Sequence, residues 1–197
     1  MCLVPTLPPP TVDWGRVYAV FGMADRLCDD SWPSDEDQAN VWTVPVLAGI
    51  TCQAVIRAIK RSFLVIYPDC LDLISDPTVK RRKDANGDYT VGVKRSINAD
   101  ADLIGVTVQE MKRRRIVGVE PIEWLLLEFG LQLTCGNLHL DKGSITMFPS
   151  IVAPDNMVLG ADWDPNMGCI IFEWYNQQKA DLSQLRARRV LRQQRGC

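Results

Sequence analysis

Apolar residues near the N-terminal end of the chain are spaced as they are on helices. After Thr11, a residue type that favours helix N-caps, apolar side chains recur every three or four residues as far as about Cys28. A second apolar stripe begins near Thr43, with Pro45 in its first turn, and continues to Arg61 with polar and basic residues on the opposite face. The pattern therefore predicts two helices, joined by a polar and acidic connector.

The spacing then changes to the period of two that is typical of strands. Residues 78–83 and 89–95 flank Asn86-Gly87, and both residues of this pair accept the positive φ of a hairpin turn. Short runs rich in β-branched, aromatic or other apolar residues predict further strands at 63–67, 103–108 and 169–175.

Local signals mark the start of two further helical segments. Thr107 and Glu110 have the spacing of a helix cap before a short basic turn, which leads to 116–119. Glu120-Pro121 opens a helix that the apolar spacing carries to about Gly130. Three alternating runs separated by turn residues then predict a β-meander at 131–135, 138–140 and 145–147.

Together these elements predict an α+β fold. N-terminal helices are followed by a mostly antiparallel sheet, built from a hairpin and a meander, with one inserted helix. The basic segment 177–194 predicts a C-terminal helix, although its apolar stripe is narrow. We divide the chain into an extended Pro-rich arm (1–10), a single α+β domain (11–175) and a basic C-terminal helix or tail (176–197).

The composition is that of a globular protein. Of the 197 residues, 47% are hydrophobic and 23% are charged, which excludes a disordered or collagen-like chain. The 7 cysteines include no C-x-x-C pair, so we expect reduced thiols and a cytoplasmic or other reducing compartment. The longest apolar stretch, 41–56, is too short and too interrupted to span a membrane, and the opening residues do not form a secretory signal. We therefore expect no membrane partner.

Charge alternates in sign along the chain. Counting Lys and Arg against Asp and Glu gives −5 for 1–40, +5 for 41–118, −7 for 119–175 and +5 for 176–197, which sum to the net charge of −2. Such blocks could pair inside one chain, let copies meet head to tail, or bind an anionic partner.

Few residues suggest catalysis. His139, the only histidine, lies between two leucines and is expected on the polar face of a strand. The segment from Asp162 to Glu173 places oxygen ligands as a calcium loop does, but Met167 stands where such a loop needs glycine, so a turn and a strand are expected instead. Asp162, Asp164 and Glu173 could also supply paired carboxylates. No nucleotide or hydrolase motif occurs, and we expect no cofactor and no metal.

Three clusters of basic residues are candidate contacts with a partner protein or with nucleic acid. Their members are Lys80, Arg81, Arg82 and Lys83; Arg113, Arg114 and Arg115; and Arg186, Arg188, Arg189 and Arg192.

The sequence favours a non-enzymatic structural or interaction subunit of a larger assembly, whose terminal segments engage neighbouring subunits of the same or another protein. A virion, connector or similar particle fits this description. Two alternatives stay open. One is an accessory protein that contacts nucleic acid through its basic clusters, and the other is an enzyme with an unrecognised carboxylate or thiol site.

Overall fold

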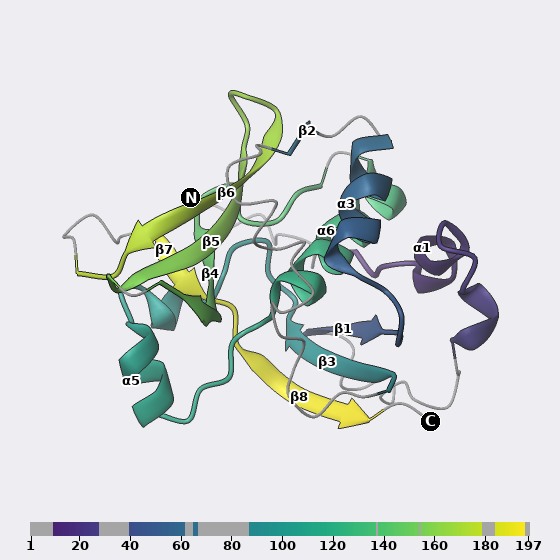
Figure 1. Ribbon diagram of the computed structural model, residues 1–197. Coiled ribbons are helices and arrows are strands. Elements are labelled where there is room, and N and C mark those ends of the chain that lie inside the picture. The colour runs from purple at the N-terminus through teal and green to yellow at the C-terminus, as the bar shows by residue number, and fades with distance from the viewer. Residues whose placement is uncertain are drawn as a thin grey trace, which may run out of the picture.

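The computed structural model describes residues 10–27, 40–61, 65–66, 87–136, 138–153, 155–178 and 184–195. In this part of the chain, helices pack with two sheets of mostly antiparallel strands, which confirms the α+β class (Figure 1). The helical elements are α1 (Trp14–Ala19), η1 (Ala24–Arg26), α3 (Cys52–Arg61), η4 (Ala101–Leu103), α5 (Val108–Arg113) and α6 (Pro121–Cys135). The strands are β1 (Val41–Val46), β2 (Val65–Ile66), β3 (Tyr89–Lys94), β4 (Ile145–Val152), β5 (Met157–Asp164), β6 (Cys169–Asn176), β7 (Leu185–Ala187) and β8 (Val190–Arg195).

The two sheets use strands from distant parts of the chain. A three-stranded antiparallel sheet has the order β1-β3-β8. A five-stranded sheet has the order β2-β6-β5-β4-β7, with antiparallel pairing among β4, β5 and β6 and parallel pairing of β2 with β6 and β7 with β4. The chain passes from the larger sheet to the smaller one directly between β7 and β8.

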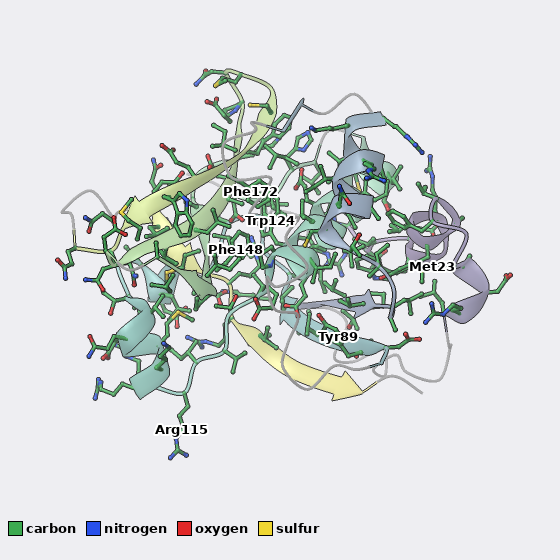
Figure 2. All side chains as sticks on the ribbon, viewed as in Figure 1. Met23, Tyr89, Arg115, Trp124, Phe148 and Phe172 are labelled. Atoms are coloured by element: carbon green, nitrogen blue, oxygen red, sulfur yellow. The ribbon has the colours of Figure 1, made fainter. Side chains whose placement is uncertain are left out.

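Helix α6 lies centrally and is buried along most of its length (Figure 1). Its start is as expected: Glu120 and Glu123 form a capping box, and Pro121 occupies the first turn. Trp124 of α6 meets Phe172 of β6 edge-on, and Phe172 stacks on Phe148 of β4 (Figure 2). These aromatic contacts join α6 to the five-stranded sheet.

The end of α6 corrects the predicted strand at 131–135. The helix continues through these residues and stops at Gly136, whose φ of 74° is a backbone conformation that glycine adopts without strain. Gly130 lies inside the helix, where a Cβ atom would collide with Val12 of the N-terminal segment. This glycine permits close packing and does not end the helix.

The N-terminal half also differs from the prediction. The first helix covers only 14–19, within the predicted 11–28, and is followed by the short turn η1. The predicted helix 43–61 was wrong over its first part, because Val41–Val46 forms β1 and the helix begins at Cys52. Pairing with β3 makes this segment a strand and directs its buried side chains into the core. A local sequence pattern does not show that this distant partner strand exists.

Other strand predictions had mixed outcomes. The strand at 89–95 is confirmed as β3, whereas its hairpin partner 78–83 lies outside the described residues. The predicted strand 103–108 is wrong, since the chain there passes from η4 into α5. Residues 138–140 form no strand, but β4 and β6 confirm the predicted strands at 145–147 and 169–175.

The predicted C-terminal helix 177–194 is wrong. Within this range, residues 185–187 form β7 and residues 190–194 belong to β8. Leu185 and Ala187 of β7 belong to the same buried cluster as Leu103 and Val108. Pairing with β4 and β3 satisfies the backbone of the two strands, and β7 buries alternate side chains, which a helix with a narrow apolar stripe could not do. Of the predicted arm 1–10, only Pro10 is among the described residues.

Candidate functional site

Arg188, one of the predicted contact residues, lies inside the protein. It occupies the link between β7 and β8 and pairs with Asp141 in the turn before β4, with 3.0 Å between Nη2 and Oδ1. The two side chains are 1% and 0% exposed. Arg188 therefore does not belong to an exposed basic surface.

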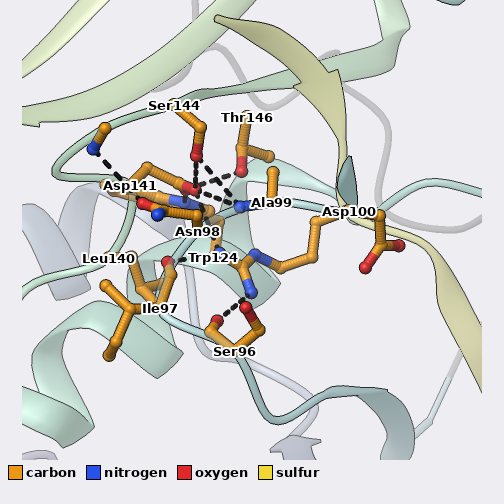
Figure 3. Close-up of polar contacts among 12 residues, drawn as sticks. Ser96, Ile97, Asn98, Ala99, Asp100, Trp124, Leu140, Asp141, Ser144 and Thr146 are labelled. Carbon is orange, nitrogen blue, oxygen red and sulfur yellow. Dashed lines mark hydrogen bonds and ion pairs between the residues drawn. The ribbon is translucent and has the colours of Figure 1, made fainter. Parts of the chain in front are cut away.

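The Asp141 carboxylate accepts hydrogen bonds from several segments (Figure 3). Its donors are the backbone N–H of Ala99 (2.8 Å), the hydroxyls of Ser144 (2.8 Å) and Thr146 (2.6 Å), the indole of Trp124 (2.8 Å) and Arg188 (3.0 Å). A buried carboxylate is stable only when its lone pairs are satisfied in this way.

Arg188 is bonded to the loop that follows β3 as well. Its Nη1 donates to the carbonyl of Ser96 at 2.7 Å, and its Nη2 donates to the carbonyl of Ile97 at 2.8 Å. The backbone N–H of Asp141 donates to the same Ile97 carbonyl at 2.9 Å. One buried ion pair thus fixes α6, the loop after β3, the start of β4 and the link from β7 to β8.

The neighbouring predicted residues are placed differently. Arg189 is partly exposed, and its Nη2 lies 2.7 Å from the exposed carboxylate of Asp102. Arg186 lies on β7 and is half-buried. Arg192 lies in β8 with its backbone opposite Gly92, and its side chain lies outside the described residues, as do Lys80, Arg81, Arg82 and Lys83.

The basic end of α5 is exposed. Thr107 caps the helix as predicted, because its hydroxyl accepts the N–H of Glu110 at 3.2 Å. The Glu110 carboxylate bonds both Arg113 and Arg114, and these two guanidinium groups lower its pKa to about 2. Arg115, which follows the helix with φ 57°, extends away from the molecule (Figure 2).

The fold brings two of the three predicted basic clusters towards each other. Gly118 forms an antiparallel bridge with Arg189, and the N–H of Val190 donates to the carbonyl of Val117 at 2.8 Å. The chain that leaves the basic end of α5 therefore runs beside the start of β8.

Beyond Val190, β8 is an edge strand. Arg192 lies opposite Gly92 and Val190 lies opposite Val93, so Leu191 is the extra residue of a β-bulge, and it is 50% exposed. The N–H of Arg95, just after β3, donates to the carbonyl of Asn40, just before β1. Every second residue before Arg95 therefore directs its backbone groups towards β1, and the residues between them, including Gly92, direct theirs towards β8. Gln193 and Arg195 consequently direct their N–H and C=O groups outward. We call these outward groups, with Leu191, the β8 edge. No described strand pairs with it.

His139 is buried, contrary to the prediction of a polar strand face. Its Nδ1 lies 2.6 Å from Oε1 of the fully buried Glu128, and its ring stacks on Trp163 with centroids 3.5 Å apart. The other Glu128 oxygen accepts the N–H of Leu140 at 2.7 Å. Burial raises the pKa of Glu128, and this pair holds the 138–140 turn against α6 and β5.

The segment with calcium-loop spacing forms a hairpin turn, as expected. Asp164 accepts the N–H groups of Asn166 (2.7 Å) and Met167 (3.2 Å), and Gly168 has a φ of 63°. Cys169 then begins β6. Asp164 is used to shape the turn between β5 and β6.

A cluster of acidic groups lies on one face of this hairpin. The Tyr175 ring packs on Gly160, where an added Cβ would lie only 2.9 Å from the ring, and the strand register places Asp162 and Glu173 on the same face. Burial, helped by the charges of Asp141, Asp164 and Glu173, raises the pKa of Asp162 to about 7. Such a group could donate a proton beside a second carboxylate.

The described cysteines and carboxylates supply no further site. Cys52, Cys135 and Cys169 are free thiols, and burial raises the pKa of Cys135 and Cys169, which disfavours the reactive thiolate. Within the described ranges, no group of three or more His, Cys, Asp or Glu side chains is arranged to hold a metal ion. No helix in these ranges is both long and apolar enough to cross a membrane.

No protein-family model matches this chain, and no curated protein or solved structure proved similar to it. Its function has to be inferred from its own geometry.

Replacing each of two adjacent arginines should distinguish the internal one from the surface one. Arg188→Met leaves Asp141 as an unpaired buried charge and should lower the free energy of unfolding by about 3–5 kcal/mol. Arg189→Met breaks an exposed pair and should cost at most about 1 kcal/mol. Urea unfolding of both variants measures the difference, and equal losses would contradict the assigned role of the Asp141–Arg188 pair.

Asp162→Asn should stabilise the protein in a pH-dependent way. The folded chain holds the Asp162 proton up to about pH 7, while the unfolded chain loses it near the ordinary pKa of 3.8. Stability therefore falls as pH rises between these values, and asparagine avoids the loss. Thermal melts should show a larger gain at pH 8 than at pH 5. Asp155→Asn, at an exposed turn, controls for the removal of one charge; a gain from Asp162→Asn that is equal at both pH values would be inconsistent with this assignment.

Proposed function

We propose that this chain is a non-enzymatic interaction subunit of a larger protein assembly, and that it engages a neighbouring protein chain through the β8 edge. The observation that carries the proposal is that no described strand pairs with the outward backbone groups of Gln193 and Arg195, next to the exposed side chain of Leu191. An edge of this kind can accept a strand from another chain by hydrogen bonding.

Two features of the surroundings support a protein partner. The start of β8 is held from inside by Arg188, which pairs with Asp141, and from outside by Val117, whose carbonyl accepts the N–H of Val190, so the strand enters the edge from a fixed position. Val117 and Leu191 are each 50% exposed, which provides apolar area beside the open backbone.

We place the protein in the cytoplasm or another reducing compartment. The free thiols of Cys52, Cys135 and Cys169 support this location. A virion, connector or other multi-protein particle formed there would provide the neighbours that the proposal requires.

Leu191→Asp tests the β8 edge in the protein's own cells. The tagged intact chain should run well above its own mass of 22.2 kDa under native conditions. The variant should run close to that mass, because a carboxylate at Leu191 would have to be desolvated against the neighbouring chain. Native electrophoresis and native mass spectrometry measure the change.

Met167→Asp is the matched control. Met167 is 56% exposed, against 50% for Leu191, but it lies in the turn between β5 and β6, away from β8. It should leave the native mass unchanged. An intact chain that runs as a free monomer, or equal effects of the two substitutions, would refute the proposed function.

A nucleic-acid-contacting accessory function is the second candidate. It is favoured by the bridge between Gly118 and Arg189, which draws the basic end of α5 towards β8. Arg113 is 73% exposed and Arg115 extends into solvent, so both can reach phosphate groups. The partial neutralisation of Arg113 by Glu110 weakens this candidate.

The double substitution Arg113→Ala and Arg115→Ala tests it. If these residues bind phosphates, oligonucleotide affinity falls and the slope of log K against log salt concentration becomes shallower by about 2. The exposed Arg57 and Arg61 on α3 provide a matched double alanine control. Fluorescence anisotropy with labelled single- and double-stranded oligonucleotides measures both quantities, and identical salt slopes in all three proteins would exclude this candidate.

A further inference from the structure

The opposite edge of the three-stranded sheet lies on β1. Pro45 directs its carbonyl outward, where it accepts the Tyr18 hydroxyl at 2.6 Å. Alternate residues of a strand face the same way, so Val41 and Thr43 also direct their N–H and C=O groups away from β3. No described strand pairs with these groups, which we call the β1 edge.

A pocket of about 450 Å³ adjoins the β1 edge. Val41 and Thr43 of β1 line it, together with apolar side chains that include Val12, Trp14 and Leu27. The Trp42 indole in its wall is held by a 2.9 Å hydrogen bond to the Pro10 carbonyl.

We propose that the β8 edge of one copy of this chain adds to the β1 edge of the next copy, with Leu191 entering the pocket beside Trp42. The inference rests on the proposed function and names the neighbour as a second copy. The two edges belong to one sheet, with β3 between them, so their union continues the sheet from subunit to subunit (Figure 1).

Charge decides in favour of this pairing over a contact between two β8 strands. β8 contains Arg192 and Arg195 and no acidic residue. The only charged residue that lines the described pocket is Asp13. Two β8 strands would therefore place like charges together, whereas a β8 strand added to the β1 edge meets the carboxylate of Asp13 beside it.

The contact is short, which predicts reversible association. Pro45 lacks an N–H, and its carbonyl is already bonded to Tyr18, so the ladder stops there and uses only Val41 and Thr43. A ladder of two residues buries a small area, and small interfaces are typical of weak complexes. Because the two surfaces differ, the contact can repeat and form chains or a closed ring.

Proline at outward-facing positions can block each edge separately. Gln193→Pro removes an N–H from the β8 edge, and Thr43→Pro removes one from the β1 edge, while neither N–H is used in pairing with β3. Pro45 shows that β1 accepts proline at such a position. Circular dichroism and thermal melts establish that each variant folds. If Gln193→Pro does not fold, Leu191→Asp is used in its place; if Thr43→Pro does not fold, Val41→Pro is used.

Purified protein is then examined by analytical ultracentrifugation over a range of concentrations. The average mass of the intact chain should rise above 22.2 kDa as its concentration increases. Each variant alone should keep the mass of 22.2 kDa at every concentration. A 1:1 mixture should form a dimer and nothing larger, because each variant keeps the edge that the other lacks.

Any other result overturns the head-to-tail contact. If the Thr43→Pro protein still dimerises by itself, two β8 edges pair with each other. If the intact chain is monomeric at every concentration, its neighbour is a different protein. In both cases the effect of Leu191→Asp on the native mass in cells still tests the proposed function. Failure of the head-to-tail contact is therefore distinguishable from failure of the proposed function.

Discussion

The buried pair of Asp141 and Arg188 determines how the two sheets are joined. Arg188 lies where the chain leaves the five-stranded sheet for the three-stranded one, and Asp141 precedes β4. Trp124 ties the same carboxylate to α6, and the carbonyls of Ser96 and Ile97 bring in the end of β3. Because neither charge can be left alone away from water, these segments have to come together as a unit.

This arrangement has a consequence for binding. β8 begins directly after Arg188, so its first residues are fixed by the interior, while Gln193 and Arg195 direct backbone groups outward. A strand that is ordered before it meets a partner loses less conformational entropy on binding. The internal ion pair therefore sets the position from which the proposed binding edge begins.

The sequence predicted elements whose signals are local. The cap formed by Thr107 and Glu110 and the start of α6 at Glu120 were found because the deciding residues are three positions apart or fewer. It misassigned 41–46, 185–187 and 190–194, whose structure depends on pairing with strands far along the chain. Charge spacing could not separate Arg188 from Arg189 either, because burial of the first depends on Asp141, 47 positions away.

The two sheet edges are each protected at one end and open at the other. On β1, Pro45 and the Tyr18 hydroxyl end the open region; on β8, pairing of Val190 with Val117 ends it, and the bulge at Leu191 follows. Proteins use proline and bulges to prevent unlimited strand addition. Placing them at one end limits an added strand to a few backbone hydrogen bonds, which favours a short contact over the continuous pairing of an aggregating edge.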